Sequence, residues 1–165
     1  MHQSINWPAS KPELYDLLAR QTEALIQDCP PISAMSNIAA LLWEALPDIN
    51  WAGFYLLKED MLYLGPFQGK TACTLIPVGR GVCGTAAATH QLQLVPDVHQ
   101  FPGHIACDSA SNSEIVIPLM ADGQLVGVMD IDSPLLNRFD EDDAHGLQAV
   151  CRLLMTIPSW RNGLI

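Results

Sequence analysis

The feature that most constrains this fold is the dipeptide Asp122-Gly123, which lies between two apolar runs. An Asp-Gly pair in this setting predicts a tight two-residue turn, because both central residues of such a turn favour positive φ. We therefore expect a β-hairpin with strands at 114–120 and 124–132. The rest of the chain has to fold around this hairpin.

The hairpin carries three carboxyl groups. Side chains alternate along a strand, so Asp130 and Asp132 share one face while Ile131 takes the other. Glu114 stands at the entrance of the hairpin, and Cys107 lies in the polar stretch before it. A fold gains little stability from carboxylates gathered near a thiol, and we take this region as the candidate site.

The surrounding pattern predicts helices at both ends of the chain. Apolar residues recur at helical spacing over about 10–27 and 33–46, and Ser10 and Glu13 have capping-box spacing. Further strands are expected at 50–57, 61–66, 73–78 and 91–95, a short helix at 82–89, a long irregular loop at 96–113, and a last helix from about 140 to 158. About six strands bunched between helices indicate an α+β fold with a largely antiparallel sheet.

Composition narrows the class of protein. The 165 residues suit one domain, and 18 acidic against 8 basic residues give a formal net charge of −10. This balance argues against a nucleic-acid partner, which needs a basic face, and fits a small cationic or zwitterionic ligand better. We see no secretory signal and no apolar run of about 18 residues, so we expect no membrane segment and a cytoplasmic location. In that reducing compartment we expect no structural disulfide framework among the five cysteines.

Gly79, Gly81 and Gly84 satisfy the spacing G-x-G-x-x-G between a strand and a helix. That spacing alone suggests dinucleotide binding, but the helix is short and no long βαβ unit surrounds it. A tight turn explains the glycines better. Cys83 lies near the start of the helix, where free N–H groups lower the pKa of a thiol. Burial beside Gly84 is the simpler explanation of this cysteine.

A metal site is a second option. His99, His104 and Cys107 could bind a metal together with Cys73 or Cys83. The paired spacing of structural zinc sites is absent, so we predict no metal.

Other reactive side chains have ordinary structural explanations. Cys29 follows a helix and Cys151 lies on the apolar stripe of the last helix, so both are interpreted as structural. Asp97 and Asp108 are interpreted as turn caps.

Trp51 and Tyr55 stand at even spacing on one predicted strand, with Gly53 between them. They therefore share a face. Core packing explains them, but beside a carboxylate cluster they could also form an aromatic cage for a thioether or an ammonium group. Both interpretations stay open on the residues alone.

Four segments in this order resemble the free methionine-(R)-sulfoxide reductases, which are small stand-alone GAF-domain enzymes. The segments are NWAGFYLL, GPFQGKTACTLIPVGRGVCGTAA, VPDVHQFPGHIACDSASNSEIVIPL and DGQLVGVMDIDSP. The likeness spans roughly residues 50–139, and the run HIACDSASNSEIVIPL is highly specific to the family. Ordinary GAF domains share the sheet but lack these thiols.

The resemblance implies roles for three cysteines. Cys107, in HIACD, corresponds to the nucleophile of the family. Cys73, in KTACT, corresponds to the usual resolving cysteine, and Cys83, in GVCG, to a second partner. The implied reaction forms a sulfenic acid on the nucleophile and then a disulfide, which thioredoxin or a similar dithiol reduces. No metal or organic cofactor is implied.

The resemblance also implies a substrate pocket and its ligand. The implied pocket residues are Trp51, Tyr55, Glu114, Asp130 and Asp132. The implied ligand is free methionine-(R)-sulfoxide. Crowded carboxyl groups cannot all ionise, so one can protonate the sulfoxide oxygen while the others pair with the ammonium group.

The expected architecture is one GAF domain over residues 1–165. Its parts are N-terminal helices at about 10–46, sheet and site at about 50–132, and a C-terminal helix at about 140–158. We expect these helices on one face of the sheet and a ligand pocket under loops on the other, with a homodimer as one compatible assembly. The alternatives are a non-catalytic GAF module that binds a small ligand and a metal-thiolate protein.

Overall fold

The computed structural model describes residues 5–103 and 108–161. In this part of the chain a six-stranded sheet is combined with four α-helices. The helices are α1 (Lys11–Leu25), α2 (Pro31–Ala45), α3 (Gly81–Thr89) and α4 (Glu141–Leu154), and short 3-10 turns occupy Val98–Gln100 and Pro158–Arg161. The strands are β1 (Trp51–Lys58), β2 (Met61–Gly69), β3 (Leu75–Pro77), β4 (Gln93–Val95), β5 (Ser113–Ala121) and β6 (Gln124–Ser133).

The predicted hairpin is confirmed as the β5–β6 pair. Asp122 and Gly123 both have positive φ, 51° and 80°, as the tight turn requires. The hairpin occupies the inner part of a sheet with the order β3-β2-β1-β6-β5-β4, and every neighbouring pair is antiparallel. Because β6 pairs with β1, the carboxylates of the hairpin lie beside a strand from the first third of the chain.

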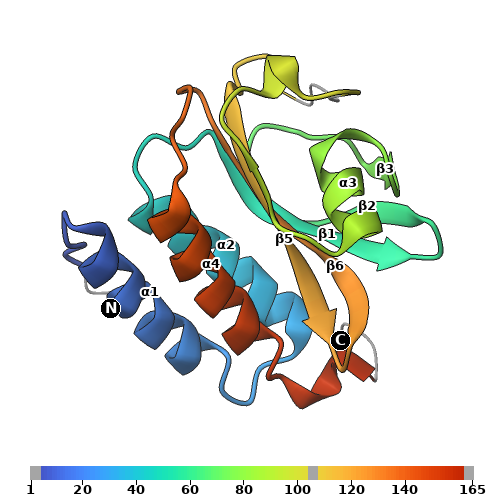
Figure 1. Cartoon of the computed structure of the whole chain (residues 1–165). Helices are drawn as coiled ribbons and strands as arrows, with labels where there is room; N and C mark the ends of the chain where they lie inside the picture. The colour runs from blue at the N-terminus through green and yellow to red at the C-terminus, as the bar shows by residue number, and fades with distance from the viewer. Residues whose placement is uncertain (1–4, 104–107, 162–165) are drawn as a thin grey trace.

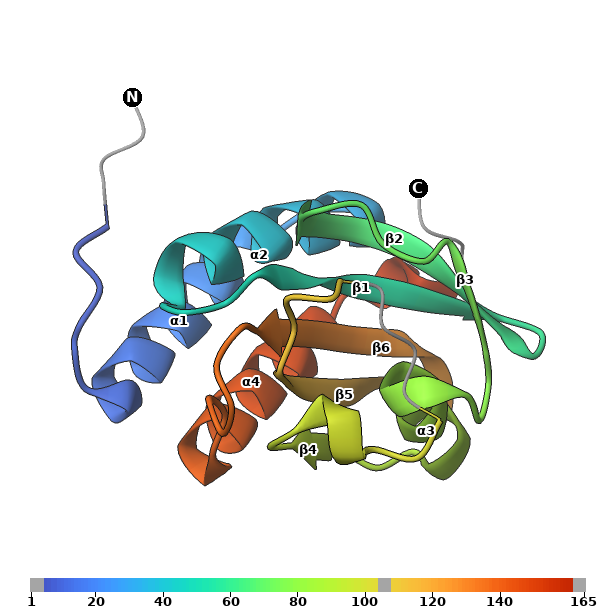
Figure 2. The ribbon, with the colours of Figure 1, turned by 90° about the horizontal axis from the view of Figure 1, so that it is seen from above.

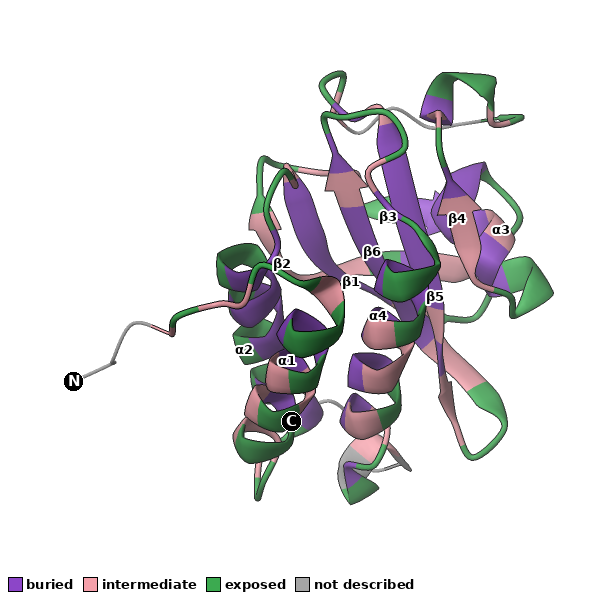
Figure 3. Ribbon diagram, turned by 60° about the vertical axis from the view of Figure 1, so that its left-hand side comes forward, coloured by how far each residue is buried: buried purple, intermediate pink, exposed green. Residues whose placement is uncertain are grey.

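Three helices cover one face of the sheet, as expected. Figure 1 shows α1, α2 and α4 on the same side, and the view from above in Figure 2 separates them from α3. The larger core lies between these helices and the sheet and includes Leu18, Ile38, Leu42, Ile131 and Leu147, all fully buried. The three central strands β1, β6 and β5 are buried along most of their length (Figure 3).

The opposite face carries α3 and a smaller core, which includes Trp51, Tyr55 and Val128. The turn before α3 explains the glycine motif. Gly79 and Gly81 have φ values of +84° and +63°. β3, which precedes the turn, pairs antiparallel with β2, so no βαβ unit surrounds the glycines. The tight-turn interpretation therefore fits the structure, and the dinucleotide motif lacks its context.

The helix caps differ from the prediction. Ser10 stands at the N-cap of α1, but its Oγ donates to Glu13 Oε2 at 2.8 Å and does not cap the backbone. The predicted capping box is therefore wrong there. A capping box forms instead at α4, where Asp140 accepts from the backbone N–H of Asp143, and Asp143 accepts from that of Asp140.

Asp143 also joins the two ends of the domain. Its carboxylate accepts from Tyr15 Oη at 2.7 Å, from Lys11 Nζ at 2.6 Å and from Arg138 Nη1 at 3.3 Å. Tyr15 and Lys11 belong to α1, so these contacts hold α1 against the start of α4. We call Asp143 with Tyr15, Lys11 and Arg138 the Asp143 clip.

Several element boundaries depart from the sequence expectation, among them the end of α4, which lies at Leu154 rather than at about 158. α2 begins at Pro31 rather than Ser33, because proline is well tolerated in the first turn of a helix. β2 continues to Gly69, and β3 and β4 have only three residues each. The predicted irregular loop contains a 3-10 turn, which Asp97 caps by accepting from the His99 N–H at 3.0 Å.

Among the described residues, no helix has the length and apolar character needed to span a membrane.

Candidate active site

A pocket opens on the α3 side of the sheet, where the N-terminal end of α3 faces β5 and β6. Glu114, Asp130 and Asp132 all line it, as predicted from the hairpin. The pairing of β5 with β6 brings the three carboxyl groups together, since Glu114 lies opposite Asp132 and Val116 opposite Asp130. Other lining residues are Ile76, Arg80, Gly81, Val82, Cys83, Asp108 and Ser111. We call Glu114, Asp130 and Asp132 the carboxyl trio.

The carboxyl trio resists ionisation, and Glu114 and Asp130 are buried while Asp132 is half-buried. Burial is the main cause that raises the pKa of Asp130 to about 6. Burial, reinforced by the neighbouring charge of Asp130, raises the pKa values of Glu114 and Asp132 well above the usual range. Glu114 and Asp130 also share a hydrogen bond when one of them is protonated. The trio can therefore hold at least one proton at neutral pH.

The trio has no cationic partner in the described part of the chain. None of its members forms an ion pair with a Lys, Arg or His side chain there. The Oδ1 atom of Asp130 is buried and has no hydrogen-bond partner. A buried polar atom without a partner is costly, so the pocket is suited to a ligand that brings positive charge or donors.

Cys83 lies at the pocket wall. Its Sγ donates to Glu114 Oε1 at 3.9 Å, and its side chain also contacts Asp130. Burial and the two carboxyl groups raise the pKa of this thiol well above its usual range. Of the two interpretations of Cys83, burial beside Gly84 fits the structure, because burial and negative neighbours outweigh the N–H groups of α3.

Trp51 and Tyr55 lie on the pocket side of β1, as predicted, and their rings stack at a centroid distance of 5.8 Å. Trp51 also stacks on Phe67, at 5.3 Å. Both residues are nearly fully buried and neither lines the pocket directly. Trp51 lies opposite Asp132 and Gly53 opposite Asp130, so the aromatic stack is immediately beside the trio.

A side chain on Gly53 would disrupt this stack. A Cβ atom there would lie 2.4 Å from Phe67 Cβ and 2.7 Å from Trp51 Cη2. The polar atoms of the two predicted cage residues are already occupied. Trp51 Nε1 donates to the carbonyl of Lys70 and Tyr55 Oη to that of Cys73, both at 3.1 Å. The stack therefore combines core packing with support of the segment that carries Cys73.

The predicted nucleophile, Cys107, and His104 lie outside the described residues. Cys73 is disulfide-bonded. The predicted approach of Cys73 to Cys107 therefore stays a prediction. His99 is described, and its Nε2 lies 2.9 Å from Asn112 Oδ1.

Sequence reasoning missed a polar network beside the pocket. Asn50 Nδ2 donates to Asp108 Oδ2 at 3.1 Å and to Ser111 Oγ at 3.0 Å. Lys70 Nζ forms an ion pair with Asp108 at 3.3 Å. Asp108 does cap a turn, since it accepts from the Ala110 N–H, but it also anchors the chain next to Cys107. The only sequence signal for this network was the position of Asn50 just before an aromatic strand, and it was too weak to predict the contacts with Asp108 and Ser111.

Comparison with known proteins agrees with this geometry. The family model for the GAF domain matches residues 30–157. The free methionine-R-sulfoxide reductase of Escherichia coli is 56% identical over 140 residues, which cover 84% of this chain and 85% of the relative. The chain belongs to the free methionine-R-sulfoxide reductase family of GAF-domain proteins.

Solved structures of the family agree over nearly the whole chain. The enzyme of Neisseria meningitidis, solved in complex with its substrate, is 43% identical with a TM-score of 0.92. It covers 98% of this chain, and 99% of its own chain is matched. The reduced Staphylococcus aureus member is 50% identical, with a TM-score of 0.84 over 87% of this chain and 94% of its own.

Proposed function

We propose that this protein reduces free L-methionine-(R)-sulfoxide to L-methionine. The observation that carries the proposal is the carboxyl trio in the pocket, two of whose members are buried and none of which forms an ion pair with a described Lys, Arg or His side chain. A free amino acid has an ammonium group, and a peptide-bound methionine sulfoxide lacks one. Identity of 56% to the Escherichia coli reductase supports the same substrate.

The trio has two roles in the proposed reaction. A protonated carboxyl group donates its proton to the sulfoxide oxygen as the S–O bond breaks. The ionised members pair with the ammonium group of the substrate. The raised pKa values of the trio support this division, because they keep a proton available near neutral pH. Trp51 and Tyr55 form the apolar wall behind the pocket.

Cys107 is the proposed nucleophile. Its thiolate attacks the sulfoxide sulfur, methionine leaves, and the cysteine is oxidised to a sulfenic acid. Cys73 then condenses with the sulfenic acid, which releases water and forms a disulfide. Thioredoxin or a similar dithiol of the cytoplasm reduces the disulfide by exchange. Cys83 is less suited to resolve the sulfenic acid, since burial raises the pKa of its thiol.

The deciding assay measures methionine release from both free sulfoxide epimers and from a peptide-bound sulfoxide. We expect release from the free R epimer and much slower release from the other two. Cys107→Ser should abolish it. Cys29→Ser is the matched control and should keep full activity, since Cys29 lies outside the pocket. Equal rates on free and peptide-bound sulfoxide would contradict the proposed role of the ammonium group.

The resolving cysteine has its own test. Cys73→Ser should still release about one methionine per enzyme molecule but should not turn over with thioredoxin. Turnover at the normal rate would move the resolving role to Cys83 or to an external thiol. A chain that binds the sulfoxide without releasing methionine would instead be a non-catalytic GAF module.

A further inference from the structure

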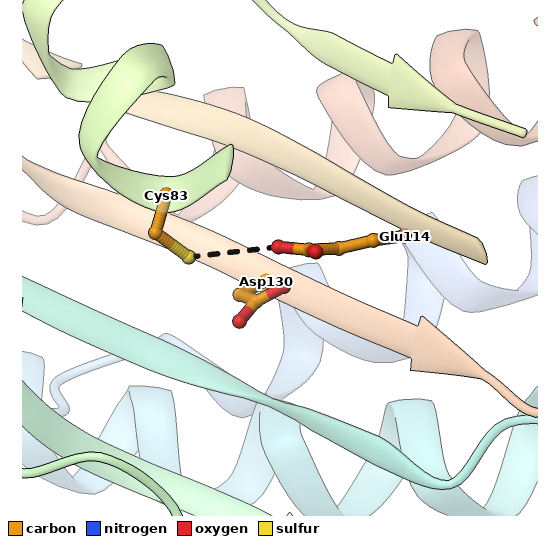
Figure 4. A group of neighbouring side chains, drawn as sticks. All are labelled: Cys83, Glu114 and Asp130. Carbon is orange, nitrogen blue, oxygen red and sulfur yellow. Dashed lines mark hydrogen bonds between the residues drawn. The ribbon is translucent and has the colours of Figure 1, made fainter. Parts of the chain in front are cut away.

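A thiol and two carboxyl groups converge at one end of the pocket. Cys83 comes from α3, Glu114 from β5 and Asp130 from β6 (Figure 4). Their ligand atoms all lie within 4.8 Å of one another, and the three residues are between 4% and 6% exposed. We call these three residues the thiol–carboxyl cluster. Three separate elements of the fold supply it, so it does not result from local sequence spacing.

The cluster has unused capacity to bind a positive charge. The buried Oδ1 of Asp130 has no hydrogen-bond partner among the residues that the structure describes. In the described part of the chain, no Lys, Arg or His side chain forms an ion pair with Glu114 or Asp130. A cation held here would satisfy Asp130 and offset the repulsion between the two carboxylates.

We propose that the thiol–carboxyl cluster is a binding site for a thiophilic divalent cation of the Zn²⁺ class. Thiolate and carboxylate oxygens are both zinc ligands, whereas Mg²⁺ and Ca²⁺ prefer oxygen alone. In tetrahedral zinc sites sulfur and oxygen ligands lie roughly 3.5 Å apart. The Cys83 Sγ to Glu114 Oε1 distance of 3.9 Å is close to that value, so small side-chain shifts suffice.

Binding displaces protons. The Cys83 thiol and any protonated carboxyl group of the cluster must lose their protons to ligate the metal, and those protons pass to solvent. The two carboxyl groups bind in their ionised forms. Cys83, Glu114 and Asp130 fill three positions, and the fourth faces the pocket, where water completes the tetrahedron.

The site overlaps the position proposed for the substrate ammonium group, since both use Glu114 and Asp130. Zn²⁺ should therefore inhibit sulfoxide reduction in competition with the substrate. This consequence rests on the proposed function, whereas metal binding itself does not. A binding measurement and an inhibition measurement can fail independently.

The binding test uses the full chain with Cys107→Ser, which removes the thiol of the alternative metal set suggested by the sequence. Titration with Co²⁺ should produce a thiolate-to-cobalt charge-transfer absorption band, and Zn²⁺ should displace the Co²⁺. Adding Cys83→Ser should abolish the band. Adding Cys29→Ser, the matched control, should leave it unchanged. A band that persists without Cys83 would overturn the proposal.

Cys83→Ser could disturb the packing around α3, so a second variant is needed. Glu114→Gln retains the thiol and the side-chain shape, and should weaken Zn²⁺ affinity at least about tenfold. Affinity should also rise with pH, because binding releases a proton. Unchanged affinity in Glu114→Gln, or no detectable binding by the folded Cys107→Ser chain, would contradict the site.

The inhibition test measures methionine release by the unmodified chain at several Zn²⁺ and sulfoxide concentrations. We expect the apparent KM to rise with Zn²⁺ while kcat stays constant. Rescue by a chelator would show that the inhibition is reversible. Zn²⁺ binding without competition would contradict the proposed overlap of the metal site with the substrate site. Absence of reductase activity would contradict the proposed function but not the metal site.

Discussion

One buried acid and a group of three acids lie on opposite faces of the same sheet, and their surroundings differ. On the helical face, Asp143 is 1% exposed and accepts hydrogen bonds from Lys11, Arg138 and Tyr15. On the other face, Glu114 and Asp130 are nearly as buried and Asp132 is half-buried. None of these three forms an ion pair with a described Lys, Arg or His side chain, although Arg80 also lines the pocket. The Asp143 carboxylate therefore has hydrogen-bond and ion-pair partners that compensate for its burial, and these contacts stabilise the fold.

The difference teaches how to separate a structural acid from a functional one. Paired buried charges are compatible with a stable fold, whereas unpaired ones raise the free energy of the folded state. Such an energetic cost is typical of a site whose buried groups gain their partners only when a ligand binds. The trio and the Asp143 clip should therefore respond in opposite ways to the removal of charge.

The largest expected effect is on activity. Glu114→Gln and Asp132→Asn should each lower kcat/KM about 100-fold, since a buried charge pair with the ligand contributes about 2–5 kcal/mol. Both variants should stay folded, because the amides keep the shape of the carboxyl groups. Steady-state kinetics on free methionine-R-sulfoxide measures this. Wild-type kinetics in both variants would remove the trio from the proposed mechanism.

The Asp143 clip should instead lose stability. Asp143→Asn leaves Lys11 and Arg138 without their shared carboxylate, and should lower the free energy of unfolding by about 3 kcal/mol. That corresponds to a decrease in Tm of about 10 °C for a chain of this size. Activity well below the Tm should stay normal. A large loss of activity without a loss of stability would contradict the structural role of Asp143.

Stability should also depend on pH through the trio. The pKa of Asp130 is about 6 in the folded protein, against about 3.9 in an unfolded chain. Above the lower value the folded state binds more protons, so stability falls as pH rises, by on the order of 3 kcal/mol for this residue. Glu114 and Asp132 act in the same direction at higher pH.

The residues around the Asp143 clip do not obscure this dependence of the free energy of unfolding on pH. The Lys11 contact lowers the pKa of Asp140 to about 2, so the stability from that contact is lost only below about pH 4. Urea unfolding between about pH 4 and about pH 7 measures the slope. Asp130→Asn should flatten it and should raise stability at the upper end. Parallel curves for the variant and the wild type would contradict the prediction.

The smallest expected effect is that of Tyr15→Phe. It removes one of the donors to Asp143 but leaves both cations, so we expect a loss of about 1–2 kcal/mol in the free energy of unfolding. Activity should not change, since Tyr15 lies on the helical side of the sheet. A loss as large as that of Asp143→Asn would show that the hydroxyl group, rather than the two cations, dominates the clip.

The sequence was sufficient for features that depend on local chemistry. The Asp122-Gly123 turn fixes the hairpin, and the alternation of side chains then places Asp130 and Asp132 on one face. The register of Glu114 does not follow from the turn alone, which would place Glu114 opposite Ile131. A shift between Leu119 and Met120 moves the pairing by one residue and brings Glu114 opposite Asp132. The shared face of Asp130 and Asp132 could therefore be predicted from local chemistry, whereas the place of Glu114 beside them depends on this irregularity.

Features that depend on distant contacts could not be predicted in this way. The pKa of Cys83 is set by burial and by carboxyl groups from two other strands, and the position of Cys83 in the helix pointed in the wrong direction. The contact between Asn50 and Asp108 joins segments 58 residues apart. The Asp143 clip joins α1 to α4 across most of the chain, and no local pattern indicates such a pairing.

The order of the strands has a consequence for self-association. Both edges of the sheet are formed by three-residue strands, β3 and β4, which leave parts of β2 and β5 without a neighbour on that side. Pro66 lies in the uncovered part of β2 and Pro118 in that of β5. Proline offers no N–H to an incoming strand. The two prolines therefore protect the sheet against edge-to-edge aggregation at the positions where short edge strands would otherwise permit it.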